Sequence, residues 1–122
     1  MRKLLIAVVA LFLTGSLATA QNVVRTGDPA KRGFKDGDFP RVKELAPGVY
    51  SYEQLRASGQ EKFTTVSLFV VTTDGVLVAD GQGNSAETKR LVGEIRKVTN
   101  QPIKYVVICS DHGDHTAGND QF

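Results

Sequence analysis

The feature that most constrains this fold is a succession of strand, turn and strand signals in the middle of the chain. Residues 63–72 are rich in β-branched and aromatic side chains, which favour extended structure. Asp74-Gly75 is a strong turn signal, and a second apolar stretch follows it at residues 76–80. We therefore expect a β-hairpin. The consecutive apolar residues 68–71 predict burial on both faces of a sheet inside a layered fold.

The next segment has the pattern of an amphipathic helix. Asn84 can cap its N-terminus, and Glu87 stands three residues later, at the spacing of a capping box. Asn100 suits a left-handed exit from the helix, and Pro102 cannot continue it. The expected apolar stripe consists of Leu91, Val92, Ile95 and Val98.

A third apolar stretch, residues 103–109, predicts a buried strand after the helix. Because it follows a strand and a helix, we expect a right-handed crossover that places it parallel to the strand before the helix. Cys109 at its end is expected to be a buried structural thiol. The predicted class is thus α/β (α+β), in which ligands bind beyond the carboxyl ends of parallel strands.

The first twenty residues resemble nothing else in the chain. Arg2 and Lys3 precede an unbroken apolar run over residues 4–13, and small residues end the segment at Ala18-Thr19-Ala20. This is the pattern of a secretory signal peptide, residues 1–20, cleaved before Gln21. The apolar run has about half the roughly 20 residues that a membrane span requires. We expect a periplasmic or secreted protein with no membrane attachment after cleavage.

Removal of the signal peptide changes the charge balance. The chain has 15 basic and 13 acidic residues, so loss of Arg2 and Lys3 leaves equal numbers, 13 of each. A neutral chain gives no reason to expect nucleic acid or an anionic membrane as a partner. Residues 21–40 combine glycine and proline with scattered charges and are predicted to be a flexible linker, followed by a partial domain at 41–122. A possible basic patch in this linker alternates with aspartates and is expected to be solvated; it consists of Lys31, Arg32 and Lys35.

Both histidines of the protein lie in the loop that follows the last predicted strand. His112, Asp114 and His115 offer two imidazoles and a carboxylate within four residues, and zinc accepts this set of nitrogen and oxygen ligands. Gly113 between them adds backbone freedom. The alternative is a solvent-exposed polar turn whose histidines cap nearby elements. The position at the end of a strand favours a ligand site.

With these residues in view, the sequence resembles the metallo-β-lactamase superfamily of zinc hydrolases. The resemblance implies the amino-terminal half of an αββα sandwich, in which two mixed sheets pack between helices. The superfamily signature at this position is HxHxDH. The matching features, within residues 41–122, are the early hairpin, Ala79-Asp80-Gly81, the helix, the stretch 102–107, and the run from Asp114 to Asn119.

The resemblance also implies roles for individual residues. His112 would bind a first metal, while Asp114 and His115 would bind a second. Asp80 would not bind the metal itself but would orient a residue that does. Ser110 stands where the signature has its first histidine, and a neutral hydroxyl is a poor zinc ligand, so the first metal position is weakened. The expected cofactor is one or two zinc ions, and binding at the second position alone is preferred over recruitment of Asp111.

The function implied by the resemblance is hydrolysis of a small-molecule substrate. Metal-activated water would attack the carbonyl of a cyclic amide, ester or thioester. The catalytic role falls on Asp114, which would orient that water and move its proton. The alternative is a non-catalytic binding or remnant protein on the same scaffold, for which Ser110 is the argument. The resemblance implies that the superfamily's other ligands and the partner sheet come from later motifs. We therefore expect residues 21–122 alone to be inactive, to expose an apolar sheet face and to aggregate or bind chaperones.

Overall fold

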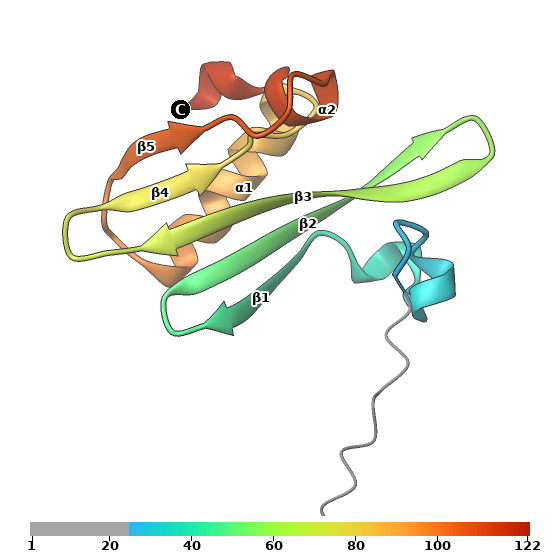
Figure 1. Cartoon of the computed structure of the whole chain (residues 1–122), viewed down its shortest axis with the longest axis horizontal. Coiled ribbons are helices and arrows are strands. Elements are labelled where there is room, and N and C mark those ends of the chain that lie inside the picture. Colours follow the sequence, from blue (N-terminus) through green and yellow to red (C-terminus); the bar gives the residue numbers. More distant parts are fainter. Residues whose placement is uncertain (1–24) are drawn as a thin grey trace, which may run out of the picture.

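The computed structural model describes residues 25–122, so the predicted signal peptide lies outside the described residues. Its centre is one five-stranded sheet (Figure 1), in which the strands lie in the order of the sequence. Neighbouring strands are antiparallel except β4 and β5, which are parallel. The strands are β1 (Arg41–Ala46), β2 (Val49–Ser58), β3 (Glu61–Val71), β4 (Val76–Ala79) and β5 (Ile103–Val107).

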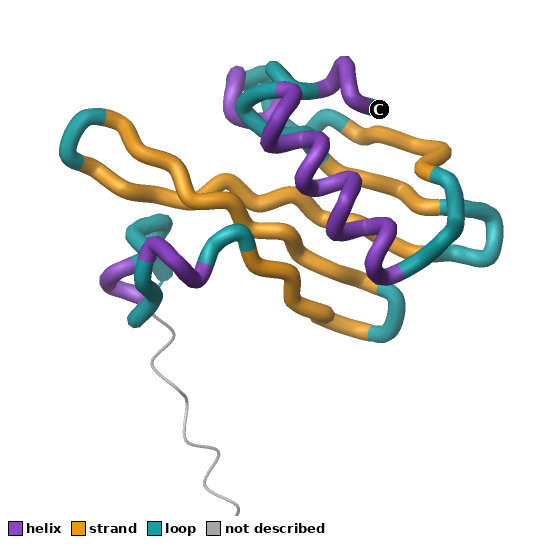
Figure 2. Tube along the Cα trace, turned by 180° about the vertical axis from the view of Figure 1, so that it is seen from behind, coloured by secondary structure: helices purple, strands orange, loops and turns teal. Residues whose placement is uncertain are grey.

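Helix α1 (Ser85–Val98) connects β4 to β5 and lies across one face of the sheet (Figure 2). The Asn84 side chain accepts a hydrogen bond from the Glu87 backbone N–H at 2.9 Å, as the predicted cap requires. The hairpin, the helix and the parallel crossover are all confirmed. The predicted left-handed exit is wrong, because the helix ends at an extended Thr99 with φ −151°. The short helices are η1 (Ala30–Arg32), η2 (Asp36–Asp38), α2 (Gly113–Thr116) and η3 (Asn119–Gln121).

The hydrophobic core lies between α1 and the sheet. Successive strand residues point to opposite faces, so alternate residues of β2, β3 and β4 lie on the face that carries α1, and those beneath the helix form the core. Val98 of the predicted apolar stripe is 39% exposed, whereas Thr88 is fully buried. The buried side of α1 therefore extends to its N-terminal end, where Thr88 Oγ1 accepts a hydrogen bond from the Gln82 N–H in the loop after β4. The core consists of Tyr52, Phe69, Val76, Val78, Leu91 and Ile95.

The opposite face of the sheet carries apolar side chains that no described element covers. Val66, Tyr105 and Val107 are exposed to 46%, 57% and 45%. Burial of the sheet on both faces is thus not found within residues 25–122, and the prediction of a buried final strand is wrong because β5 lies at the sheet edge. Cys109, just beyond β5, is exposed, which contradicts the prediction of a buried thiol.

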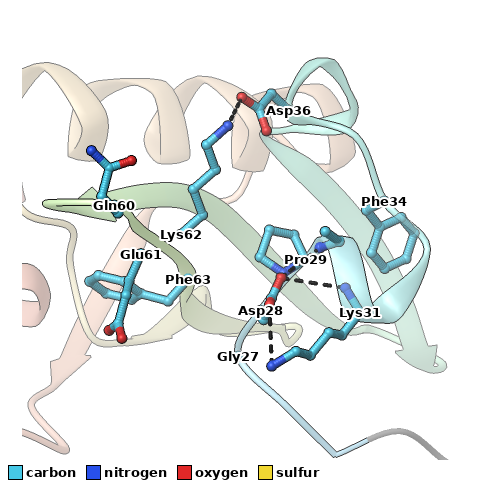
Figure 3. A pocket seen from close by; sticks show the side chains of 11 residues that line it. Gly27, Asp28, Pro29, Lys31, Phe34, Asp36, Gln60, Glu61, Lys62 and Phe63 are labelled. Atoms are coloured by element: carbon cyan, nitrogen blue, oxygen red, sulfur yellow. Dashed lines mark hydrogen bonds and ion pairs between the residues drawn. The ribbon is translucent and has the colours of Figure 1, made fainter.

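The described part of the predicted linker, residues 25–40, packs against the sheet. Arg32 forms a two-point ion pair with Glu53 of β2, with 3.1 Å between Nη2 and Oε2, so the prediction of a solvated side chain is wrong for Arg32. A shallow cavity of about 660 Å³ separates this segment from the tip of the β2–β3 hairpin. Figure 3 shows Lys62 of the hairpin reaching across to Asp36. Two 3-10 turns and these contacts replace the expected flexible chain, while the domain boundaries stay a prediction.

Candidate functional site

The candidate site lies at the carboxyl ends of the parallel strands β4 and β5. Asp80 directly follows β4, and its backbone N–H donates to the Val107 carbonyl at 2.8 Å. Its φ of +63° is rare for a residue other than glycine and turns the chain sharply at the strand end. The Asp80 side chain is buried, and its Oδ1 accepts a hydrogen bond from the Cys109 N–H at 2.6 Å. This carboxylate is therefore fixed between the two strand ends.

The second oxygen of Asp80 orients a histidine of the following loop. Oδ2 lies 3.0 Å from Nδ1 of His115. A carboxylate can only accept, so Nδ1 carries the proton of this hydrogen bond, and in the neutral ring Nε2 keeps its lone pair. Three-quarters of the His115 side chain is shielded from solvent. Asp80 therefore holds His115 with a potential metal-binding atom directed away from the strand ends.

Asp114 stands beside that free nitrogen. Its Oδ2 lies 3.6 Å from Nε2 of His115 and accepts a hydrogen bond from Oγ1 of Thr65, on β3, at 2.7 Å. Burial raises the pKa of Asp114, but the Thr65 hydroxyl, His115 and the positive charge of Arg56 outweigh it, so the pKa lies below its ordinary value. Asp114 is consequently an anion over the whole physiological range.

Local backbone structure explains this arrangement. His112 is the N-cap of α2, and Gly113 to Thr116 form its single turn, closed by the Ala117 N–H donating to the Gly113 carbonyl at 2.9 Å. The turn is seated on the loop after β4, since the Gly81 N–H donates to the His115 carbonyl at 2.9 Å. This turn directs Asp114 and His115 inward and leaves the His112 side chain 78% exposed.

Two glycines allow the loops to approach so closely. A Cβ on Gly118 would overlap the Thr88 hydroxyl and the Asn84 carbonyl at the start of α1. A Cβ on Gly83 would overlap the guanidinium of Arg56, which is paired with Glu87 of α1. Close contact with the Asn84 backbone therefore selects glycine at position 118, whereas at position 83 the neighbour is the end of a flexible side chain that could move aside.

The structure brings together three of the residues that the sequence singles out and separates the others. Asp80, Asp114 and His115 form one cluster, whereas His112 and Asp111 point to solvent, the latter with a fully exposed side chain. Sequence reasoning missed Thr65 and the neighbouring charge of Arg56. Thr65 and Ser67 occupy alternate positions of β3, but the strand also contains Glu61, Lys62 and Thr64, so this pattern alone does not single out Thr65.

Several solved structures have a fold similar to this one. They are metallo-β-lactamases from Pontibacter korlensis (TM-score 0.62, 21% identity), Hirschia baltica (0.61, 21%) and Erythrobacter litoralis (0.60, 22%). Each alignment covers 66% of this chain but only 36% or 37% of the other, so the chain spans little more than a third of their length. No protein-family model and no curated protein matches the sequence. The fold is therefore part of the metallo-β-lactamase fold, and the predicted α/β class and resemblance are confirmed.

The donor geometry can be compared with what a zinc ion requires. Two ligands on one tetrahedral zinc, each at about 2.0–2.1 Å, lie about 3.3–3.4 Å from each other. The 3.6 Å between Asp114 Oδ2 and His115 Nε2 fits such a pair. Within residues 25–122, no group of three or more His, Cys, Asp and Glu side chains is arranged to hold a metal. The described residues thus fit half of a zinc site, and the ligand roles of His112, Asp114 and His115 stay predictions.

Proposed function

We propose that this chain forms part of an exported, zinc-dependent hydrolase of the metallo-β-lactamase type. The substrate class is a small molecule with a cyclic amide, ester or thioester carbonyl. The observation that carries the proposal is the chain of contacts from Asp80 through His115 to Asp114 at the ends of β4 and β5. In open α/β sheets, this edge is where ligands bind.

The residues at this edge have different proposed roles. Asp114 Oδ2 and His115 Nε2 would hold the metal, which when bound lowers the pKa of water toward neutrality. Asp80 retains the proton on His115 Nδ1, so that Nε2 stays available. Asp114, already ionised, can accept a hydrogen bond from a water molecule and take up its proton. A catalytic zinc needs about three protein ligands, so a further donor has to join this pair.

A second candidate function is supported by a specific observation. Ser110 stands where the superfamily signature has a histidine, and the neighbouring His112 is exposed and apart from the Asp114–His115 pair. A protein with only this pair would bind metal or a ligand without turning over a substrate. We therefore keep a non-catalytic binding or remnant protein as the alternative.

The location and partners belong to the same proposal. The sequence pattern of residues 1–20 supports export to the periplasm or the exterior. In the part of the chain that the structure describes, no helix has the length and apolar character needed to cross a membrane. The small-molecule substrate follows from the likeness to metallo-β-lactamases, and the equal numbers of acidic and basic residues after position 20 give no support for nucleic acid as a partner.

The proposal is tested by hydrolysis of a chromogenic cephalosporin with the full-length protein of which this chain is proposed to form part. We expect hydrolysis that stops on addition of a chelator and falls by at least about 100-fold in Asp114→Ala, as expected for loss of a general base that also binds metal. Asp74→Ala is the matched control, because it removes an exposed carboxylate from the β3–β4 turn. Activity that is equal in wild type and Asp114→Ala would contradict the proposed role of Asp114.

Metal analysis separates the two candidate functions. Protein purified without added zinc is expected to contain at most about one zinc per chain, because Ser110 weakens the first position. Nearly two tightly bound zinc ions per chain would contradict this expectation. Metal binding without chelator-sensitive hydrolysis would favour the binding protein over the enzyme.

A further inference from the structure

Thr65 is a buried polar residue that the proposed chemistry does not yet use. It lies in β3 on the face that α1 covers, and only 2% of it is exposed. Its hydroxyl donates to Oδ2 of Asp114 at 2.7 Å, across 49 residues of sequence. Burial of a hydroxyl costs free energy unless it finds a partner, and here the partner is the carboxylate of the candidate site.

The contact fixes the position of one carboxylate oxygen. Asp114 lies in the first turn of a four-residue helix and is part of a surface loop, so little else in its own element restrains its side chain. Thr65 is β-branched and sits in the interior of a strand, which restricts its χ1 rotation. The hydroxyl thus acts as a rigid donor. Asp114 Oδ2 lies 2.7 Å from Oγ1 of Thr65 and 3.6 Å from Nε2 of His115.

The two residues of the candidate ligand pair are supported in parallel ways. His115 is held through Nδ1 by Asp80, at the end of β4. Asp114 is held through Oδ2 by Thr65, on the neighbouring strand β3. Each potential ligand therefore has its own buried partner, and both partners stand on the sheet. Such supporting contacts orient metal ligands and limit the cost of ordering them when the ion binds.

We propose that Thr65 is a positioning residue, whose hydroxyl keeps Asp114 beside His115 so that the pair binds a divalent metal ion as one unit. The inference rests on the proposed function, because it assumes that this pair binds metal. It goes beyond that function by assigning a role to a strand residue that touches neither metal nor substrate. A purely structural role, tying α2 to β3, predicts a loss of stability without a specific loss of metal affinity.

The test is Co²⁺ affinity of the full chain, measured by competition with a chromophoric chelator. Thr65→Val keeps the shape of the side chain and removes the donor, and we expect about 10-fold weaker binding. Thr65→Ser restores the donor and should restore most of the affinity. Thr64→Val is the matched control. Thr64 precedes Thr65 in β3, and its hydroxyl donates instead to Glu53, at 2.7 Å. Its Co²⁺ affinity should equal that of the wild type.

A double-mutant cycle shows whether Thr65 acts through Asp114. In an Asp114→Asn background, the added Thr65→Val change should not weaken Co²⁺ binding further. Equal affinities of wild type and Thr65→Val, or equal losses in Thr65→Val and Thr65→Ser, would overturn the inference and leave the proposed function standing. A wild-type chain that binds no Co²⁺ would overturn both. If Thr65→Val does not fold, Thr65→Ala is compared with Thr65→Ser in the same way.

Discussion

The two faces of the sheet carry similarly apolar side chains but differ in how far these side chains are buried. On the face under α1, Tyr52, Phe69 and Val78 are completely buried. On the other face, Val66 and Tyr105 are about half exposed, although they belong to the same sheet and are just as apolar. The difference lies in what covers each face within residues 25–122. Hydrophobicity alone therefore identifies the residues that can form a core, and a covering element decides which of them do.

The covered face also changes character along its length. Toward the turn between β3 and β4 it is apolar, whereas toward the candidate site it carries Thr65 and Ser67. Ser67 Oγ donates to the Gly81 carbonyl at 3.0 Å and accepts from the side-chain amide of Gln82 at 2.7 Å. The same sheet surface thus packs the helix at one end and fixes the site loops at the other. Among residues 25–122, no comparable network of hydrogen bonds joins side chains of the open face to the loop after β4.

The largest loss of stability is expected from truncation of Phe69, on the covered face. Phe69→Ala removes a fully buried ring that stacks on Tyr50 at 4.8 Å between centroids. Such changes cost about 3–5 kcal/mol, which is comparable to the whole stability of a small domain. We expect the helical signal in far-ultraviolet circular dichroism to collapse at 25 °C.

Val66→Ala is the control for this change on the open face. Val66 is 46% exposed, so its truncation should leave the dichroism spectrum unchanged. Equal losses in the two variants would mean that the open face is covered in solution, and the comparison between the faces would then fail.

An intermediate loss of stability is expected from substitution of Glu53, a buried carboxylate on the otherwise open face. Burial raises the pKa of Glu53, but hydrogen bonds from Arg32 and Thr64 and the charges of Arg32 and Arg41 outweigh it, and the pKa lies below its usual range. A lowered pKa in the folded state stabilises the docked segment 25–40 above the unfolded pKa of about 4.3. This contribution is lost as the pH falls through the folded pKa.

Hydrogen exchange of residues 25–40 checks this expectation. In the wild type, protection should be constant at neutral pH and fall below about pH 4. Glu53→Gln should weaken protection at neutral pH by about 1–2 kcal/mol, because Arg32 loses a charged hydrogen-bond partner. Glu44→Gln removes an exposed carboxylate of β1 and serves as the control. Unaltered protection in Glu53→Gln would show that the ion pair does not hold the segment.

The elements that could be predicted from sequence are those with local signals. Asp74-Gly75 fixes the β3–β4 hairpin, and Asn84 caps α1 through contacts within four residues. The parallel placement of β5 follows from the connection through α1, because a helix between two strands returns the chain to the end of the sheet where the first strand began. Apart from the helix exit near Asn100, which is a local failure, the failures depend on distant residues. Arg32 was expected in solvent because Glu53, its partner, is 21 residues away, and Cys109 was expected inside because an edge position has no local signature.

The candidate site shows the same division. The cluster Asp114–His115 is adjacent in sequence, and the resemblance to a known superfamily pointed to Asp80. The contact between Asp80 and His115 is now seen, at 3.0 Å. Thr65 could not be predicted in this way, because threonine is common in strands. Its contact with Asp114 arises only because α2 packs on β3. Nor did the sequence indicate that His112 faces solvent, since the direction of a side chain in a one-turn helix depends on how that turn is seated.

The smallest effect on stability is expected where the open face is made polar. Tyr105 and Val107 are exposed on β5, so Tyr105→Lys with Val107→Lys should change the stability by at most about 0.5 kcal/mol per site and leave the dichroism spectrum intact. The same change should sharply reduce self-association and the fluorescence of a dye that binds apolar surfaces, because two charges interrupt the exposed patch. Lys104→Arg, on the same strand, is the control, because it changes an exposed residue without changing the charge. Loss of the folded spectrum in the double variant would instead mean that these side chains are buried in solution, most simply by another copy of this face. The two faces of the sheet would then differ in their partner and not in their exposure.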